Sequence, residues 1–325
     1  MLMDRTNSKH PQLIKDILLF TKKFNENPLP PIEDYKNLRE VIDFVQKSQE
    51  GDDLPDCEIN DVNLPIGFEN NLPVRIFKPQ DSNDKMLPII IYLHGGGFVY
   101  GSKDSYNRFI KTIVNNTGCA LIFPSYSLSP ENKFPNALNE CYQTLNYFYE
   151  YSSNYNLDKD KIAIVGDSSG ANLAISTNIM NIENNGPKVS FMALINPITN
   201  LRLKGKSMRD FKYGPYLTKK NMKKYVISYI SKKQDVYNKY VSPYYASDDD
   251  LKRLPDTFII TSQNDPLRDD GELFGSKLMN LGVNVLCVRY LGTIHSFMTI
   301  NALKDTFVSK AAINQLCCLL KIKLQ

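Results

Sequence analysis

The feature that most constrains this chain is the alternation of short, uninterrupted apolar runs with helix-like patterns from about residue 87 onward. A strand buried on both faces is apolar along its whole length, and such strands belong to parallel sheets covered by helices. The expected strands span residues 87–93, 120–123, 162–165, 190–195, 257–261 and 283–290. The expected helices span residues 106–115, 136–151, 170–182, 272–281 and 301–320. The pattern predicts an α/β protein with a mostly parallel sheet and helices on both faces.

The N-terminal part of the chain has a different character. Residues 11–25 and 33–49 place apolar side chains at helical spacing, and a proline-rich breaker at 27–31 separates them. We therefore expect an N-terminal helical element over residues 1–50 and a main domain over residues 51–325.

Two further segments modify the main domain. Residues 58–64 and 72–77 have the pattern of an antiparallel strand pair with a polar turn between them. Residues 200–250, rich in Lys and Tyr, interrupt the alternation of strands and helices. We expect this insertion to form a lid over a site. Its Lys-rich helix with Tyr225, Val226, Tyr229 and Ile230 on one face suits a solvated helix better than a membrane-surface helix.

Composition limits the classes of function. The chain has 325 residues, of which 42% are hydrophobic, enough for one large domain with a modest accessory element. Its 39 basic and 35 acidic side chains leave a net charge of +4. Over this length such a charge predicts neither nucleic-acid binding nor strong membrane attraction.

The expected compartment follows from the N-terminus and the cysteines. Residues 1–20 have no continuous apolar core of the kind that a signal peptide needs, and no stretch approaches the ~20 apolar residues that span a bilayer. Irregular spacing, mostly inside apolar runs, favours reduced core cysteines over a disulfide framework. The six are Cys57, Cys119, Cys141, Cys287, Cys317 and Cys318. We expect a cytoplasmic protein without stable membrane insertion.

Histidine is scarce in this chain. Only His10, His94 and His295 are present, so a neutral-pH base must be one of them or a strongly perturbed carboxylate or lysine. The sequence contains no H-E-x-x-H and no C-x-x-C motif, so no metal site is expected.

One motif has the form of a nucleophile turn. Gly166-Asp167-Ser168-Ser169-Gly170 directly follows an expected strand and precedes an expected helix. A sharp strand-to-helix turn exposes a serine near amide donors, and it needs small residues two positions away on each side. The alternative is a helix start capped by Asp167 or Ser168.

A glycine-rich loop follows the strand at 87–93. In His94-Gly95-Gly96-Gly97-Phe98 the glycines allow the backbone to turn amide hydrogens towards a developing negative oxygen. The alternative is a flexible turn; a dinucleotide loop is disfavoured because G-x-G-x-x-G spacing is absent. We expect His94 to shape this loop rather than act as the base.

Two further loops complete the pattern. Asp265 follows the strand at 257–261 and is preferred to Asp269 and Asp270 as a partner for a histidine, because it is nearer the strand end. His295 follows the strand at 283–290. The order Ser168, Asp265, His295 is that of α/β-hydrolases, so a catalytic triad is the favoured interpretation.

From about residue 60 onward, the sequence resembles the hormone-sensitive-lipase-like branch of esterases and lipases. The segments that carry the resemblance are His94-Gly95-Gly96-Gly97, Tyr126-Ser127-Leu128-Ser129-Pro130-Glu131, Gly166-Asp167-Ser168-Ser169-Gly170-Ala171-Asn172-Leu173-Ala174, Asp265-Pro266-Leu267-Arg268-Asp269-Asp270-Gly271 and Tyr290-Leu291-Gly292-Thr293-Ile294-His295-Ser296-Phe297. The resemblance implies an α/β-hydrolase fold with an eight-stranded, mostly parallel sheet. It also implies a helical cap built from the N-terminal helices and the insertion at about 200–250.

The resemblance assigns roles to the site residues. Ser168 would be the nucleophile, His295 the base and Asp265 the triad acid, while the amides of Gly96, Gly97 and Ser169 would form the oxyanion hole. Such an enzyme would hydrolyse esters through an acyl-enzyme without a cofactor or a metal. A capped pocket would favour short to medium acyl chains.

The sequence departs from the family pattern at four positions. It has Phe98 where Trp is usual, Ser127 in place of Arg, Ser169 in place of Ala and Ala171 in place of Gly. These differences concern efficiency and pocket shape more than the type of reaction, because the expected donor at 169 is a backbone amide.

Several properties stay open at this level. Five aromatic side chains are candidates to line the substrate pocket, and packing in the core is an equally expected alternative for them. They are Phe98, Phe211, Tyr213, Tyr216 and Phe297. An amidase, an acyltransferase or a non-catalytic small-molecule receptor would share the constellation, although His295 argues against the receptor. The natural ester substrate and the oligomeric state, a homodimer included, are not readable.

Overall fold

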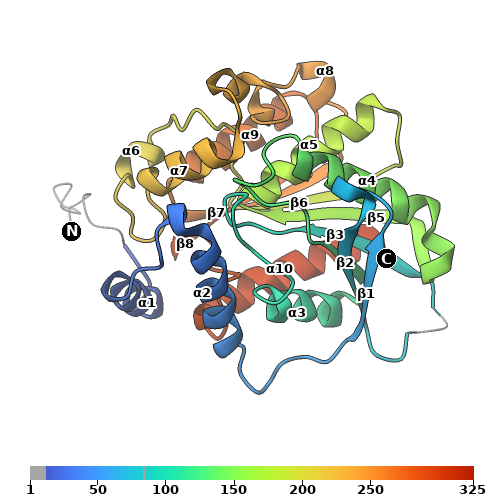
Figure 1. The fold of residues 1–325 in the computed structure, drawn as a ribbon, viewed down its shortest axis with the longest axis horizontal. Helices are drawn as coiled ribbons and strands as arrows, with labels where there is room; N and C mark the ends of the chain where they lie inside the picture. Colours follow the sequence, from blue (N-terminus) through green and yellow to red (C-terminus); the bar gives the residue numbers. More distant parts are fainter. Residues whose placement is uncertain (1–11, 83–84) are drawn as a thin grey trace, which may run out of the picture.

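The computed structural model describes residues 12–82 and 85–325, so His10 and the predicted helix residue Pro11 lie outside the described residues. Eight strands form one sheet in the order β1-β2-β4-β3-β5-β6-β7-β8 (Figure 1). Their bounds are β1 Glu58–Leu64, β2 Leu72–Lys78, β3 Leu87–Leu93, β4 Ala120–Pro124, β5 Leu157–Asp167, β6 Phe191–Ile195, β7 Asp256–Asn264 and β8 Val285–Ile294.

Pairing within the sheet is mostly parallel. The strands β4, β3, β5, β6, β7 and β8 run parallel to one another, whereas β2 is antiparallel to both β1 and β4. The predicted α/β-hydrolase sheet, with eight mostly parallel strands, is confirmed. The parallel arrangement brings the carboxyl ends of β3, β5, β7 and β8 to one edge of the sheet.

Helices cover both faces of the sheet. The helices are α1 Lys15–Glu26, α2 Tyr35–Ser48, α3 Asn107–Thr117, α4 Asn136–Glu150, α5 Ser169–Glu183, α6 Ser207–Asp210, α7 Lys219–Tyr229, α8 Asp248–Leu251, α9 Arg268–Asn280 and α10 Phe307–Leu324. In Figure 1, α3 and α10 lie below the sheet, and α5 and α9 lie above it. Successive β3 residues alternate between the two cores: Ile89 and Ile91 pack on the α4–α5 side, and Ile90 and Tyr92 pack on the α3–α10 side.

The N-terminal helices and the 200–250 segment gather beside one end of the sheet. The α7 helix contacts the turn at Ile32–Asp34 that precedes α2, and Tyr216 before α7 contacts Phe24 of α1, although these segments are far apart in the sequence (Figure 1). Within the 200–250 segment, α7 is the longest helix, and the Thr218 side chain caps its start by accepting from the amide of Asn221. Tyr225, Val226 and Tyr229 are buried in α7, as the apolar pattern predicts, and Ile230 is buried just beyond its end.

Three details differ from the sequence prediction. The C-terminal helix begins at Phe307 rather than at residue 301, because Thr306 caps it and residues Asn301–Leu303 form a separate 3-10 turn. The strand expected at 162–165 extends over the whole of β5. All six cysteines are free, but Cys287 and Cys318 are exposed, so they are not core residues.

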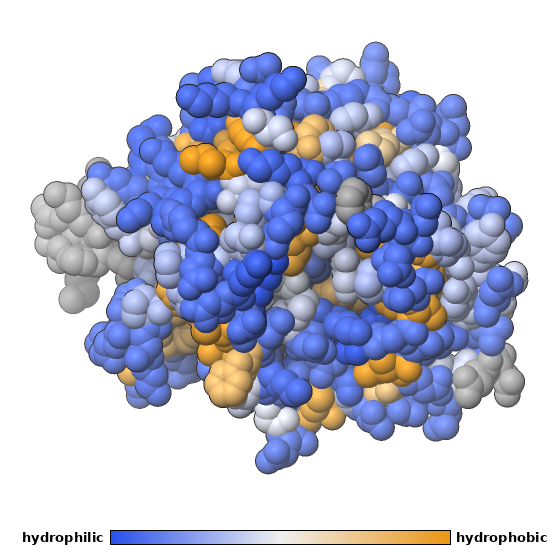
Figure 2. Space-filling model, viewed as in Figure 1, coloured by the Kyte–Doolittle hydropathy of each residue, from blue (hydrophilic) through white to orange (hydrophobic). Residues whose placement is uncertain are grey.

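The surface is mainly hydrophilic on the side drawn in Figure 2, where the hydrophobic patches are separate and form no continuous band. Among the residues that the structure describes, no helix has the length and apolar character needed to cross a membrane.

Candidate active site

Ser168 occupies a sharp turn between β5 and α5. Its φ and ψ angles are 53° and −115°, a conformation that non-glycine residues rarely adopt. Its N–H donates to the carbonyl oxygen of Ile195 at 2.8 Å, which holds the turn against β6. Small neighbours are required, because a Cβ on Gly170 would lie only 1.9 Å from the carbonyl oxygen of Leu93.

His295 and Asp265 follow the ends of β8 and β7, so all three side chains meet at the carboxyl edge of the sheet. His295 Nε2 lies 2.9 Å from Ser168 Oγ, and His295 Nδ1 lies 2.8 Å from Asp265 Oδ2. Asp265 is fully buried, and its Oδ1 accepts from the amide of Leu267 at 2.8 Å. The carboxylate is therefore held in place, and it can select the imidazole tautomer that accepts the serine proton at Nε2.

The two neighbouring aspartates have other partners. Asp269 Oδ2 accepts from the amide of Ser207 at 2.7 Å, and Asp270 Oδ2 accepts from the amides of Thr199 and Asn200 at 2.7 and 3.0 Å. Both carboxylates thus anchor the start of the 200–250 segment to α9, and neither contacts His295.

The glycine loop is held by a second buried aspartate, Asp167. Its Oδ1 accepts from the amide of Gly95 at 2.8 Å and from the hydroxyl of Tyr92 at 2.7 Å, while its Oδ2 accepts from the hydroxyl of Tyr106 at 2.9 Å. Burial raises the pKa of Asp167 despite these hydrogen bonds. The residue before the nucleophile therefore orients the loop that faces the nucleophile.

His94 has the structural role that the sequence suggests. Its ring is buried between Tyr126 and Phe123, with ring centroids 4.2 and 5.3 Å away, and its Nδ1 lies 2.8 Å from the Gly95 carbonyl oxygen. Burial lowers the pKa of His94 to about 4, so this ring is neutral at physiological pH.

A cavity of about 360 Å³ lies over the triad. Ser168 and His295 line it together with the expected oxyanion residues Gly96, Gly97 and Ser169. The opposite wall comes from α1, α2 and residues 216–226, which include most of α7. This wall packs closely on the glycine loop at Gly97, whose φ is +63° and where an added Cβ would lie 2.4 Å from the ring of Tyr225.

The five aromatic residues proposed for the pocket divide into two groups. Phe98 and Tyr216 line the cavity, but Phe211, Tyr213 and Phe297 do not, so their assignment is corrected. Phe211 lies against the Arg268 guanidinium, and Tyr213 is 84% exposed. Phe297 is fully buried against Tyr290, because the turn after His295 directs it into the core below the sheet.

Sequence reasoning missed the residues that join α2 to the catalytic loops. Arg39 Nε donates to the Val99 carbonyl oxygen at 2.7 Å, and its guanidinium pairs with Glu131 and donates to the Ser129 carbonyl oxygen. Gln46 donates to the Thr299 carbonyl oxygen at 2.8 Å and accepts from the Asn301 amide at 3.0 Å. In the sequence, these residues are only polar positions of an amphipathic helix. Such positions are common, so they do not indicate contacts with the catalytic loops.

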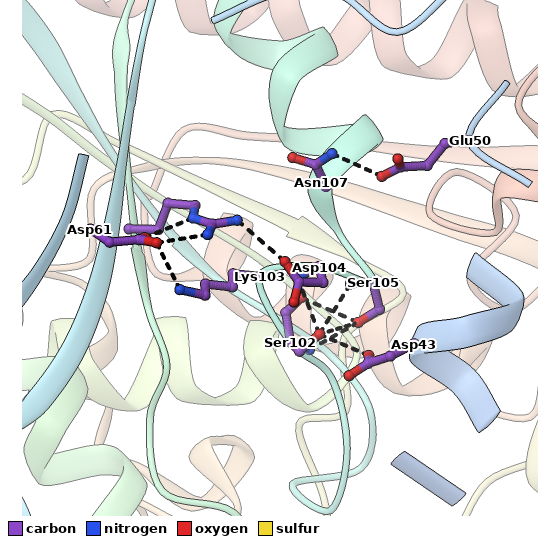
Figure 3. A network of polar contacts seen from close by, with 9 residues as sticks. Asp43, Glu50, Asp61, Ser102, Lys103, Asp104, Ser105 and Asn107 are labelled. Atoms are coloured by element: carbon purple, nitrogen blue, oxygen red, sulfur yellow. Dashed lines mark hydrogen bonds and ion pairs between the residues drawn. The ribbon is translucent and has the colours of Figure 1, made fainter. Parts of the chain in front are cut away.

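Asp43 of α2 belongs to a larger polar network (Figure 3). Asp43 accepts from the Ser102 hydroxyl at 2.8 Å, and Ser102 belongs to the loop that continues from the glycines. Farther along this loop, Asp104 pairs with Arg75 of β2, which also holds Asp61 of β1. The network connects the edge of the sheet to the helix that walls the cavity.

Three of the residues that depart from the family pattern have defined partners in the structure. The Ser127 amide and hydroxyl both donate to the buried carboxylate of Glu140 at 2.6 Å, where the usual Arg would have supplied a charge. Phe98 stacks on Tyr229 with ring centroids 3.7 Å apart, and Ser169 Oγ accepts from the amide of Phe98 at 3.2 Å.

Within residues 12–82 and 85–325, no group of three or more His, Cys, Asp or Glu side chains is placed to hold a metal ion. A serine, a histidine and an aspartate on three loops at the carboxyl edge of a mostly parallel sheet define a serine hydrolase of the α/β-hydrolase class.

Comparisons with known proteins agree with this class. The alpha/beta hydrolase fold family matches residues 90–299. The chain is 36% identical to an alpha/beta hydrolase of Acanthamoeba polyphaga mimivirus, over 84% of this chain and 77% of the relative. It is 35% identical to an esterase of Gibberella moniliformis, over 74% of this chain and 76% of the relative.

The fold is similar to that of solved esterases. A thermostable esterase of Pseudomonas putida matches with a TM-score of 0.91 and 28% identity, over 97% of this chain and 99% of the other. The chain therefore belongs to the α/β-hydrolase family, in its hormone-sensitive-lipase-like branch, and is an esterase with a serine catalytic triad.

Proposed function

We propose that this esterase prefers soluble carboxylic esters with short to medium acyl chains and hydrolyses them through an acyl-enzyme on Ser168. The observation that carries the proposal is the hydrogen-bonded chain from Ser168 through His295 to Asp265 on the wall of an apolar cavity. The volume of about 360 Å³ lies at the lower end of the range of about 300–1,000 Å³ for small-molecule pockets.

In the proposed cycle, Ser168 Oγ attacks the ester carbonyl carbon while His295 Nε2 takes the hydroxyl proton. The amides of Gly96, Gly97 and Ser169 stabilise the oxyanion, and removal of one such donor costs about 2.7–4 kcal/mol in other serine hydrolases. The tetrahedral intermediate collapses, and the alcohol leaves with the proton from His295. Water then attacks the acyl-enzyme with the same histidine as base, and the acid is released.

The lid supports the limit on chain length. Residues of α1, α2 and the segment around α7 form the wall opposite Ser168 and leave a cavity of about 360 Å³, which a short or medium acyl chain fills. The ion pair between Lys224 of α7 and Glu33, with Nζ and Oε2 2.7 Å apart, joins the two parts of this lid.

The test is hydrolysis of p-nitrophenyl esters from acetate to decanoate by the wild type and by Ser168→Ala. We expect kcat/KM to fall by at least about 10³-fold in the variant, since little beyond binding and the oxyanion donors remains. We also expect the wild type to act faster on the short and medium esters than on decanoate. Equal turnover by both proteins would refute the triad, and a preference for decanoate would refute the chain-length limit.

A further inference from the structure

Three aromatic rings from distant segments meet on the cavity wall. Phe20 and Phe24 belong to α1, and Tyr216 precedes α7. The ring centroids are 4.7 Å apart for Phe24 and Tyr216, 5.9 Å for Phe20 and Tyr216, and 6.0 Å for Phe20 and Phe24. We call these three residues the aromatic cluster.

The rings of the aromatic cluster are only partly buried by the protein. All three residues are half-buried, in contrast to the large aromatic residues of the core, such as Phe77 and Phe258. Within the cavity, Phe98 already stacks on Tyr229 at 3.7 Å, so one of its ring faces is occupied. The aromatic cluster thus offers partly exposed ring surface to a ligand on the cavity wall.

The surroundings of the aromatic cluster are apolar and stiff. Pro28, Leu29, Pro30 and Leu217 line the same cavity. Proline restricts the backbone of the segment that leads from α1 to α2, which limits how far the wall can rearrange. A ligand group in this region therefore loses water and meets a wall of fixed shape.

The angles between the rings favour an aromatic ligand. Tyr216 is tilted by 58° to Phe24 and by 52° to Phe20, so an incoming ring would meet both faces and edges. Aromatic pairs prefer such offset or edge-to-face arrangements at centroid distances of about 4.5–7 Å, and they gain more than burial alone provides. A saturated ring of similar size gains only the burial.

We propose that the aromatic cluster is a subsite for an aromatic ring of the substrate, so that esters with an arylalkyl alcohol or an arylacyl group are the preferred class. This inference rests on the proposed function and specifies its substrate. The ring belongs either to the alcohol part or to the acyl part of the ester, and the two parts of the experiment separate these cases.

The experiment compares matched aromatic and saturated esters. The alcohol part uses benzyl acetate against cyclohexylmethyl acetate, and the acyl part uses ethyl phenylacetate against ethyl cyclohexylacetate. The proteins are the wild type, Phe24→Leu, Tyr216→Leu and a control, Phe44→Leu, whose ring is 72% exposed on α2 and does not line the cavity. Each aromatic-to-saturated ratio of kcat/KM is compared with that of the wild type, which cancels differences in intrinsic reactivity.

In one of the two parts, we expect Phe24→Leu and Tyr216→Leu to lower the ratio by about two- to tenfold, the range for losing one ring contact. Phe44→Leu should leave the ratio unchanged. The wild type alone gives a second test: benzyl alcohol should inhibit ethyl acetate hydrolysis more strongly than cyclohexylmethanol. Unchanged ratios in both parts, or equal inhibition by the two alcohols, would overturn the proposal.

Ethyl acetate separates this proposal from the proposed function. If the wild type hydrolyses ethyl acetate and Ser168→Ala does not, the esterase mechanism holds whatever the ring preference is. Aromatic-to-saturated ratios that stay unchanged in the variants, with retained ethyl acetate turnover, therefore count against the aromatic subsite alone.

Discussion

The hydroxyl group of Ser169 joins the two loops that surround the nucleophile. It accepts a hydrogen bond from the Phe98 amide at 3.2 Å, and it also lies within hydrogen-bonding reach of the Tyr126 hydroxyl. Phe98 has a φ of +65° and follows Gly97 with a φ of +63°. A left-handed conformation disfavours a bulky residue, so the loop needs interactions that hold it in this shape.

At this scale we expect Ser169→Ala to lower kcat by about two- to tenfold, because a hydrogen bond of this type contributes about 0.5–1.5 kcal/mol. The amide at position 169 stays in place, so the change acts on the position of the glycine loop. Steady-state kinetics on p-nitrophenyl acetate measure the change in kcat. The affinity for a trifluoromethyl ketone, whose adduct with the serine mimics the oxyanion, measures the effect on the oxyanion site.

Ser82→Ala is the matched control, because Ser82 is also buried and donates to the Pro79 carbonyl oxygen at 2.7 Å, away from the site. If Ser169→Ala weakens the binding of the ketone no more than Ser82→Ala does, Ser169 has no role in positioning the oxyanion loop.

Among the elements, α2 connects the lid to the catalytic loops. Arg39 holds the segment after the glycines, and Gln46 holds the segment after His295. Two loops that follow different strands are thereby attached to one helix that lines the cavity. Displacement of α2 would disturb both the oxyanion side and the histidine side of the site.

We expect Arg39→Ala to lower the free energy of unfolding by about 1–3 kcal/mol, mainly because the partly buried carbonyl oxygens of Val99 and Ser129 lose a charged donor. The exposed pair with Glu131 contributes little. The kcat/KM for esters should fall as well. Urea unfolding and steady-state kinetics give the two measurements.

Lys206→Ala is the control at this scale, because it removes an exposed ion pair with Asp210 on α6. Its effect on stability should stay within about 0.5 kcal/mol. An effect of Arg39→Ala no larger than that of Lys206→Ala would contradict the role given to α2.

For the whole molecule, two kinds of carboxyl group change the free energy of unfolding in opposite directions as the pH rises. Hydrogen bonds from Arg75 hold the pKa of Asp61 well below its usual value, and hydrogen bonds from Arg108 lower the pKa of Asp53. Their stabilisation is present above the unfolded pKa of about 4 and is lost as the pH falls. Burial raises the pKa of Asp270 to about 7, so the folded state keeps a proton that the unfolded state releases. Stability therefore decreases as the pH rises from about 4 to 7 through this group.

We expect Asp270→Asn to stabilise the protein by about 1–3 kcal/mol at pH 8 and to have little effect near pH 4. The asparagine oxygen can accept from the amides of Thr199 and Asn200, and no charge is buried. Urea unfolding of both proteins between pH 4 and 8 measures the difference.

Asp269→Asn should behave in the opposite way. Burial alone would raise the pKa of Asp269, but hydrogen bonds from the Ser207 backbone and from Arg268 lower it. The substitution should therefore destabilise the protein at pH 8. A difference between Asp270→Asn and the wild type that does not vary with pH would exclude the buried ionisation as its cause.

Much of the fold and the triad could be predicted from local patterns. Continuous apolar runs identified the buried parallel strands, and parallel strands bring their carboxyl ends to one edge. Because Ser168, Asp265 and His295 each follow a strand, in the order typical of α/β-hydrolases, their three loops were predicted to meet without any knowledge of distances. The helix boundary at Phe307 was missed because the cap at Thr306 is a local hydrogen bond inside a continuous helical pattern.

The pocket and the supports of the site were not predictable in this way. Whether an aromatic side chain faces a cavity or the core depends on which segments pack against it, and those lie far away in the sequence. Phe297 follows the catalytic histidine but is buried below the sheet, whereas Phe20 and Phe24 meet Tyr216 on the cavity wall.

The sequence alone therefore determined the sheet, the order of the catalytic loops and the family, because these depend on periodicity and on residue types at strand ends. The tertiary structure alone decided which side chains form the cavity and how Asp167 and Arg39 hold its loops. The physical reason is that these properties depend on distances between segments that only packing brings together.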